Sequence, residues 1–453
     1  MHAFFHKPLE TLALGLHLCE TRMYLCQEPD PHQLEMFEAS LPFDDKLARD
    51  NRWLKLAHTL NWPEWERDYA KLFAADGRPG LRARFVLGAL ILKHQYQTSD
   101  EEILQTILES PYLQYFIGLP RFTTTMPFEA SSLSRVRERL GEKTFAAFEQ
   151  TLINTLVAKK LIRANAVLVD ATVYESEITY PTDCGLLEKA RVFCVKQIER
   201  LREVVPEKVR TYCRVARKAY LNFTKKKRKT KKEIRRMQKA SLQYLRRNIE
   251  QVTNLIAKVK DLGHTVAEEA ATKFATVKKI YEQQKEMYDD KKKKIEARLV
   301  SLCKPYVRPI VRGKNSKDVE FGAKVQLSCV DGYLFADYIS FDNFNEGTKL
   351  KDSIAAFEKR FARPPEYVAM DQIYGSRENR AYLKEKEIRA SVKPLGRPKK
   401  DHETSTAEER WRKKKQRERN RVEGAIGNSK NYHDLGLVRA KTSKTEKSWI
   451  QMA

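Results

Sequence analysis

The N-terminal third of the chain shows hydrophobic positions at helical spacing. Residues 66–160 show a helical pattern, with a strongly apolar run at 85–92 after the turn at Gly77–Gly80, which predicts an all-α domain. Residues 1–65 show no clear period, so their structure stays open. Within them, Trp53, Trp62 and Trp65 indicate a packed aromatic patch.

Two helix starts can be placed in this region. Ser99 precedes DEEILQTILES, with Glu102 three residues later, which is the spacing of a capping box. A second short helix, SLSRVRERL, is expected to open at Ser131 or Ser132. Several short helices with basic exposed faces resemble a helix-turn-helix assembly, although most small helical domains do not bind DNA.

Strand patterns dominate the C-terminal part, residues 161–453. AVLVD is a β-branched run that ends on an acid, and Asp331-Gly332 lies between two alternating runs, which predicts a β-hairpin. The pattern therefore predicts an α/β domain with a mixed sheet flanked by helices. The expected strands are 166–170, the two arms within 323–342, 367–370 and 388–392, and the expected helices are 348–361, 379–386 and one that carries Glu423.

A long helical insertion interrupts this domain at residues 185–312. Its apolar residues recur at intervals of three and four, and DLGH at 261–264 supplies a glycine turn, so we expect an antiparallel helical hairpin. Basic runs lie at 225–232 and 291–294. The second run is best explained as a solvated face, whereas phosphate contact and solvation are equally good explanations of the first.

The charge of the chain is concentrated. Residues 185–314 hold 37 lysines and arginines against 14 acids, and residues 395–421 hold 11 against 5. The net positive charge of these two segments together is larger than the net charge of +26 on all 453 residues. Localised positive charge favours a polyanionic partner, most simply nucleic acid.

Several function classes are excluded by the sequence. The seven cysteines form no CxxC pair or zinc spacing, so reduced thiols are expected. His2 and His6 lack the glutamate that a zinc-protease motif requires, and no phosphate-binding or dinucleotide glycine motif occurs. No uncharged 18-residue run could cross a membrane, so no membrane partner is expected.

Three acids are candidates for a shared site. Asp170 and Asp371 end the first and fourth expected strands, and Glu423 lies on the last helix between Arg419 and Lys430, on one helix face. Carboxylates that converge in this way suit two Mg²⁺ ions in phosphoryl transfer. Each acid also has an ordinary explanation, because either aspartate could cap a turn and Glu423 could form a helix ion pair.

These motifs resemble an insertion-sequence DDE transposase. The similarity covers most of the chain from about Leu72 onward. Its N-terminal domain is similar to the InsH-type branch of the IS-five-like group. The segments that carry the resemblance are GRPGLRARFVLGALILKHQYQTSDEEI (77–103), VLVDATVYESEITYPTD (167–183), VEFGAKVQLSCVDGY (319–333), AMDQIYGSRENRAYLKEKEIR (369–389), KPLGRP (393–398) and RNRVEGAIGNSKNYHDLGLVRAK (419–441).

The resemblance implies an RNase-H-like catalytic domain in which Asp170, Asp371 and Glu423 bind two Mg²⁺ ions, with Mn²⁺ as a substitute. It also implies a bacterial cytoplasmic, nucleoid-associated protein. Its partners would be double-stranded DNA, as terminal inverted repeats and target, and a second copy in a homodimeric DNA complex. Arg419 and Lys430 would contact DNA, and so would five residues of the insertion. These are Lys225, Lys226, Lys227, Arg228 and Lys229.

Two departures from the family pattern stand out. Related transposases carry a Tyr-Arg-Glu-Lys signature, and its last three positions are Arg419, Glu423 and Lys430, but the tyrosine position holds Gln416. The sequence also stops at SWIQMA, where relatives look as if they continue. Trp449, Ile450 and Met452 are therefore expected to be incompletely packed, as in a truncated copy.

The expected function is Mg²⁺-dependent cleavage of transposon ends and strand transfer of their 3′-hydroxyl groups into target DNA. Two alternatives remain open at this point. One is a non-catalytic nucleic-acid-binding protein that uses its basic hairpin as a clamp. The other is a decayed, truncated and inactive transposase that binds ends only.

Overall fold

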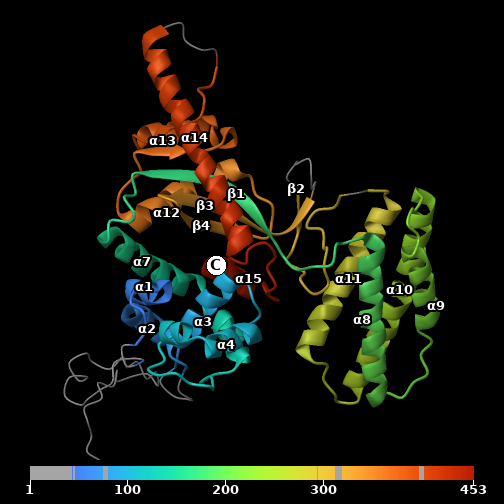
Figure 1. Ribbon diagram of the computed structural model, residues 1–453. Coiled ribbons are helices and arrows are strands. Elements are labelled where there is room, and N and C mark those ends of the chain that lie inside the picture. The colour runs from blue at the N-terminus through green and yellow to red at the C-terminus, as the bar shows by residue number, and fades with distance from the viewer. Residues whose placement is uncertain (1–42, 44–45, 75–79, 293, 312–318, 397–401) are drawn as a thin grey trace, which may run out of the picture. The chain divides into compact units, whose positions relative to one another are not determined.

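A computed structural model describes residues 43, 46–74, 80–292, 294–311, 319–396 and 402–453. The chain divides into two compact units, Met1–Leu161 with Met452 and Ile162–Gln451 with Ala453 (Figure 1). No helix in the described ranges is long and apolar enough to span a bilayer. The five cysteines in these ranges are free thiols.

The first unit is all-helical where it is described. Trp53, Trp62 and Trp65 are buried in one core with the apolar residues of the later helices, so the expected aromatic patch is confirmed. The boundary expected at residue 65 falls inside α2, and the core continues across it. The helices are α1 (Arg52–Thr59), α2 (Trp62–Ala70), α3 (Ala83–Tyr96), α4 (Asp100–Glu109), α5 (Pro111–Phe116), α6 (Ala130–Arg139) and α7 (Glu142–Ala158).

The helix starts in this unit follow local capping chemistry. The Ser99 hydroxyl accepts a hydrogen bond from the Glu102 N–H at 3.1 Å, which confirms Ser99 as the N-cap residue and one half of the expected capping box. Helix α6 begins earlier than expected, at Ala130 with Glu129 as its N-cap residue. The opening at Ser131 or Ser132 was therefore placed one or two residues too late, within the usual uncertainty of helix ends.

The second unit is built on a mixed sheet, as expected. Its strand order is β2-β3-β1-β5-β6, and β4 pairs with β3. Strand β3 is antiparallel to both of its neighbours β1 and β4, whereas β1, β5 and β6 run parallel to one another. The strands are β1 (Ala166–Glu175), β2 (Pro309–Val311), β3 (Val319–Val330), β4 (Tyr333–Ser340), β5 (Tyr367–Ala369) and β6 (Arg389–Ala390).

The hairpin turn between β3 and β4 confirms the predicted Asp331-Gly332 signal. Both residues have positive φ, 52° and 96°, which is the backbone twist that a two-residue hairpin loop needs. The Asp331 carboxylate also accepts hydrogen bonds from the N–H groups of Arg163 and Ala164 at 2.7 and 3.0 Å. The turn thereby fastens the segment that leads into β1.

One strand is longer than predicted. The expected strand 166–170 ends on Asp170, but β1 runs on to Glu175, so Asp170 lies in the middle of the strand. Antiparallel pairing with β3 continues past Asp170 to the Glu175–Gly322 pair, because β3 itself extends to Val319. Although a strand was expected within 323–342, its pairing with β1 could not be predicted, because the two strands lie far apart in the sequence.

Helices complete the second unit. Figure 1 shows α14 crossing the sheet, and its residue Val422 is buried with Leu168, Cys329 and Ala369. The residues of β1 alternate between the two faces of the sheet, so Leu168, Asp170 and Tyr174 share the face that α14 covers. These elements are the 3₁₀ turn η2 (Glu346–Lys349), α12 (Leu350–Phe361), the 3₁₀ turn η3 (Gln372–Tyr374), α13 (Arg377–Glu385), α14 (His402–Tyr432) and α15 (Ser443–Met452).

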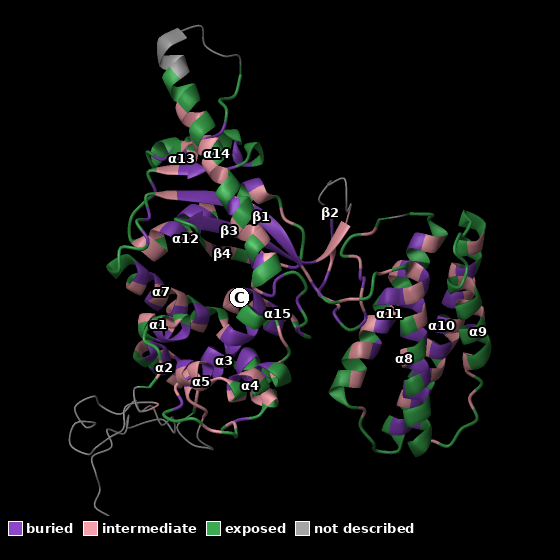
Figure 2. Ribbon diagram, in the orientation of Figure 1, coloured by how far each residue is buried: buried purple, intermediate pink, exposed green. Residues whose placement is uncertain are grey.

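The insertion contains more than a helical hairpin. Helices α10 and α11 do form the expected hairpin about Gly263, which has φ 78°. Two further helices, α8 and α9, pack against this hairpin. Buried apolar residues of α8, α10 and α11 form one hydrophobic core within the insertion (Figure 2). The apolar residues between 186 and 201, on α8, cover the apolar face of the hairpin, which would otherwise be exposed to water. The helices are α8 (Asp183–Val204), α9 (Cys213–Thr224), α10 (Lys231–Asp261) and α11 (Glu268–Asp289).

The last helix is well packed in its own unit. Trp449 and Ile450 are buried beside Tyr174, Val325 and Leu435. The Trp449 indole N–H donates to the Asp434 carbonyl at 3.0 Å. The expectation that these two side chains are incompletely packed is therefore wrong, because strands β1 and β3 already cover them.

Candidate active site

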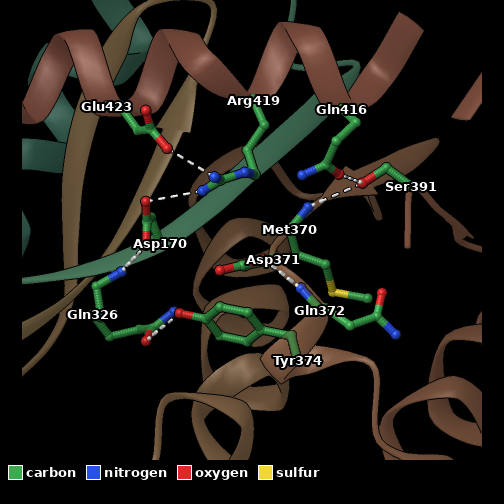
Figure 3. A network of polar contacts seen from close by, with 11 residues as sticks. Asp170, Gln326, Met370, Asp371, Gln372, Tyr374, Ser391, Gln416, Arg419 and Glu423 are labelled. Atoms are coloured by element: carbon green, nitrogen blue, oxygen red, sulfur yellow. Dashed lines mark hydrogen bonds and ion pairs between the residues drawn. The ribbon is translucent and has the colours of Figure 1, made fainter. Parts of the chain in front are cut away.

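Asp170 lies within β1, and Asp371 lies two residues beyond the end of the neighbouring strand β5. Strands β1 and β5 pair in parallel, with Leu168 opposite Ala369. Each aspartate stands two residues beyond that pair, and residues two apart on a strand point to the same face. The register therefore places both acids on the face covered by α14, as Figure 3 shows.

Each aspartate is oriented by a local hydrogen bond. The Asp170 carboxylate accepts the Ala171 N–H at 2.8 Å, and the Asp371 carboxylate accepts the Gln372 N–H at 2.7 Å. Asp371 is also the N-cap residue of η3, so the capping explanation considered for it holds alongside its place in the site. Asp371 is exposed, whereas the Asp170 side chain is only 19% exposed.

Arg419 joins Asp170 to Glu423. Its guanidinium donates to Asp170 Oδ2 at 3.1 Å and to Glu423 Oε1 at 2.7 Å (Figure 3). Arg419 is 13% exposed and Glu423 is 57% exposed. Glu423 does form the helix ion pair that its spacing allows, but the same arginine brings it to the strand that carries Asp170.

The electrostatics of Asp170 show crowding by other acids. Burial raises the pKa of its carboxyl group above the ordinary value, and Glu346 and Glu423 add to that rise. The Ala171 hydrogen bond and Arg419 act in the opposite direction without cancelling it. A bound cation would stabilise the ionised form of a carboxylate that is partly desolvated and surrounded by other negative charges.

Glu346 is a fourth acid that the sequence interpretation missed. It begins η2 and forms an ion pair with the buried Lys324 at 3.0 Å. The amide of Asn379 donates to the carbonyls of Gly347 and Tyr374 at 2.7 and 2.9 Å, so η2 is held against the turn that follows Asp371. A usable signal existed, because Glu346, like Asp371, stands in a turn between a strand and a helix.

Tyr374 and Gln326 lie beneath the acids. The Tyr374 hydroxyl donates to Gln326 Oε1 at 3.1 Å. Burial raises the pKa of Tyr374 above its ordinary value, and Glu346, Asp170 and Asp371 contribute to the rise. Three carboxylates are therefore near one buried hydroxyl. Nothing in the sequence around Tyr374 or Gln326 could have revealed this, because it depends on tertiary packing.

Gln416, at the signature's tyrosine position, is bonded within the same region. Its Oε1 accepts from the Ser391 hydroxyl at 3.1 Å, and the Ser391 oxygen accepts the Met370 N–H at 3.2 Å (Figure 3). Met370 directly precedes Asp371. Ser391 was also missed, because a lone serine after a short strand has no distinctive pattern.

The basic residues predicted to contact DNA lie in two places. The Lys430 ammonium lies 5.7 Å from the centre of the Tyr174 ring, on the α14 side of β1. Tyr174 is four residues beyond Asp170, roughly 13 Å along the strand. Residues 225–232 are all exposed, as both explanations of this run, phosphate contact and solvation, require.

Carboxylates are suitable ligands for a hard divalent cation such as Mg²⁺. In the parts of the chain that the structure describes, however, no three His, Cys, Asp or Glu side chains stand close enough together to hold a metal. The Arg419 guanidinium lies between two of the candidate ligands. The oxygen donors of these acids therefore suit a divalent cation chemically, while in the structure Arg419 pairs with Asp170 and Glu423.

Comparisons with known proteins bear on both units. Residues 41–139 match a family model described as "Transposase domain (DUF772)", and residues 368–453 match one described as "Transposase DDE domain". The chain is similar to "Uncharacterized protein ORF8 in nfe locus" of Rhizobium meliloti, with 31% identity over 153 residues, 32% of this chain and 72% of that protein. No solved structure matches the chain.

Proposed function

Because this chain belongs to the insertion-sequence DDE transposases, we propose that it cuts DNA at the ends of its element and joins the freed 3′-hydroxyl groups to target DNA. Asp170, Asp371 and Glu423 are the proposed metal ligands, for two Mg²⁺ ions or Mn²⁺ in their place. The observation that carries this proposal is that the register of β1 and β5 places the two aspartates on one face, with Arg419 linking Asp170 to Glu423.

The sheet supports an RNase-H-like interpretation of the second unit. Three antiparallel strands are continued by two parallel ones, and α14 delivers Glu423 to the same face. Divalent ions, when bound, activate an attacking oxygen and stabilise charge on the phosphate. The chain supplies the oxygen ligands, and burial of Asp170 among other acids gives a cation a reason to bind there.

Arg419 would change partners as the site fills. In the structure its guanidinium neutralises Asp170 and Glu423, and a divalent cation held by the proposed ligands would supply positive charge in its place. The released guanidinium, on a face that also carries Lys430, could then donate two parallel hydrogen bonds to a phosphate. Arg419 would thus couple cation binding to DNA binding.

The finer features of the proposal concern partners. We assign the outward run Lys225, Lys226, Lys227, Arg228 and Lys229 to contact with DNA phosphates, because all five are exposed and carry positive charge. The InsH-type helical domain would help to bind the transposon ends. A homodimer in the DNA complex and a nucleoid-associated place in the bacterial cytoplasm complete the proposal.

A cleavage assay on duplexes that carry the element's own ends tests this function. We expect 3′-hydroxyl products that require Mg²⁺ or Mn²⁺ and are absent in EDTA, and strand transfer when target DNA is added. Binding of the same duplexes without any cleavage would instead support a decayed transposase. Equal affinity for end and unrelated DNA, also without cleavage, would support a general nucleic-acid-binding protein.

A further inference from the structure

The strand that presents Asp371 is short and weakly held on one side. Strand β5 pairs with β6 through only two residue pairs, of which Val368 with Ala390 is the last. The Ser391 N–H still donates to the Val368 carbonyl at 3.0 Å. Beyond that backbone bond, the next contact is made by a side chain, because the Ser391 hydroxyl oxygen accepts a hydrogen bond from the Met370 N–H at 3.2 Å. A side chain therefore holds the backbone one residue before Asp371.

The Ser391 hydroxyl is also hydrogen-bonded to α14, through Gln416. Ser391 is 3% exposed, so its single proton needs a partner within the protein. Its oxygen already accepts from Met370, and its proton is donated to Gln416 Oε1 at 3.1 Å. The chain Met370 N–H to Ser391 to Gln416 therefore requires an acceptor at position 416, which an aliphatic side chain cannot supply.

The two ends of this chain of bonds belong to elements that carry proposed metal ligands. Met370 precedes Asp371, and Gln416 stands seven residues before Glu423, about 10 Å along the helix axis. Figure 3 shows Gln416, Arg419 and Glu423 on the side of α14 that faces the strand ends. The contact thus links the helix that carries one acid to the strand end that carries another.

We propose that Gln416 is a positioning residue that acts through Ser391 to fix the separation of Glu423 from Asp371, and with it the affinity of the site for divalent cations. This inference rests on the proposed function, because it concerns the same three acids. In this chain a carboxamide, in place of the signature's tyrosine, connects α14 to the outer strands of the sheet.

Calcium binding by the full-length protein, measured by calorimetry, tests the role without requiring turnover. We expect Gln416→Leu and Ser391→Ala each to weaken Ca²⁺ binding roughly 10-fold, the lower end of the effects of outer-shell partners on metal sites. Ser391→Thr keeps the hydroxyl group and should restore near-normal binding. The Mg²⁺ concentration for half-maximal cleavage should rise in parallel, while kcat at saturating Mg²⁺ stays close to wild type.

Two comparisons separate positioning from simple stability. Combining Gln416→Leu with Ser391→Ala should cost little more than either change alone, because both break one chain of bonds. Asn428→Leu is the control, since Asn428 is an exposed carboxamide on the same helix. Unchanged Ca²⁺ affinity with a lowered Tm, or additive losses in the double variant, would overturn the inference. Absence of Ca²⁺ binding and of cleavage in the wild type would instead refute the proposed function.

Discussion

At the scale of single residues, the proposed role of Asp170 as a metal ligand needs its ionised form, whereas folding favours its neutral form. Burial raises the pKa of its carboxyl group, so its ionised form opposes folding. The stability that Asp170 contributes is therefore present below its ordinary pKa and is lost as the pH rises through the raised value.

This conflict predicts a pH-dependent effect of Asp170→Asn in metal-free protein. The Tm of the variant minus the Tm of the wild type should increase as the pH rises from about 4 to about 7, because the neutral amide has no charge to bury. Thermal unfolding in EDTA across this range measures the difference. A difference that does not vary with pH would show that ionisation of Asp170 does not oppose folding.

Neutralising the acids one at a time separates cutting from binding. Asp170→Asn, Asp371→Asn and Glu423→Gln should each abolish cleavage while binding of end duplexes stays intact or tightens, because removing negative charge does not weaken attraction for phosphate. Gel shifts and cleavage of the same duplexes give both readouts. Normal cleavage by Glu423→Gln would show that Glu423 is not the third acid, and Glu346 would then be the next to change.

At the scale of elements, the turn that carries Glu346 depends on close backbone approach. A Cβ atom at Gly347 would lie 2.7 Å from the carbonyl oxygen of Ile373, so η2 must move away from η3 if alanine is introduced. We expect Gly347→Ala to destabilise the protein by about 1–3 kcal/mol and to reduce cleavage. Gly424→Ala is the control, since nothing lies within 4 Å of its Cβ position on α14, and it should be neutral or stabilising. Equal effects in denaturant unfolding would rule out the close-approach argument.

The basic run before α10 can be tested without disturbing the helix start. Lys226 pairs with Glu233, which completes the capping box with Thr230, whereas no contact found among the described residues joins Lys225, Lys227 or Arg228 to another side chain. Replacing these three by Gln should lower the log–log salt slope of DNA binding by up to nearly three units, about 0.9 for each phosphate contact. A variant with Gln at positions 291, 292 and 294 removes the same charge and should leave the slope unchanged. An unchanged slope in the first variant would mean a solvated face.

Sequence patterns located most elements but not their tertiary extensions. The hairpin at Asp331-Gly332 and the cap at Ser99 were predictable because their signals are local. The length of β1 and the packing of α8 against α10 were not, since each depends on a partner far along the chain. At the candidate site the three acids were named from strand ends and helix spacing. The contacts of Glu346, Tyr374 and Ser391 arise only when separate elements meet.

At the scale of the whole molecule, one buried ion pair fastens distant parts of the second unit. The Lys304 ammonium donates to Glu446 Oε1 at 2.6 Å across 142 positions of sequence, and the two side chains are 8% and 1% exposed. The Ser176 hydroxyl, just beyond β1, donates to the other carboxylate oxygen at 2.7 Å. The chain just beyond the strand that carries Asp170, the C-terminal end of the insertion and helix α15 therefore meet at one carboxylate.

Removing one partner of this pair should be costly, because it leaves a charge buried without compensation. We expect Glu446→Gln to lower the free energy of unfolding by about 3–5 kcal/mol. The double variant Lys304→Met with Glu446→Leu should recover most of that loss, since apolar replacements of similar size leave no buried charge. Denaturant unfolding of the wild type, the single and the double variants measures both effects. A loss below about 1 kcal/mol in Glu446→Gln, or a double variant less stable than the single one, would show that the pair does not hold these segments together through its charges.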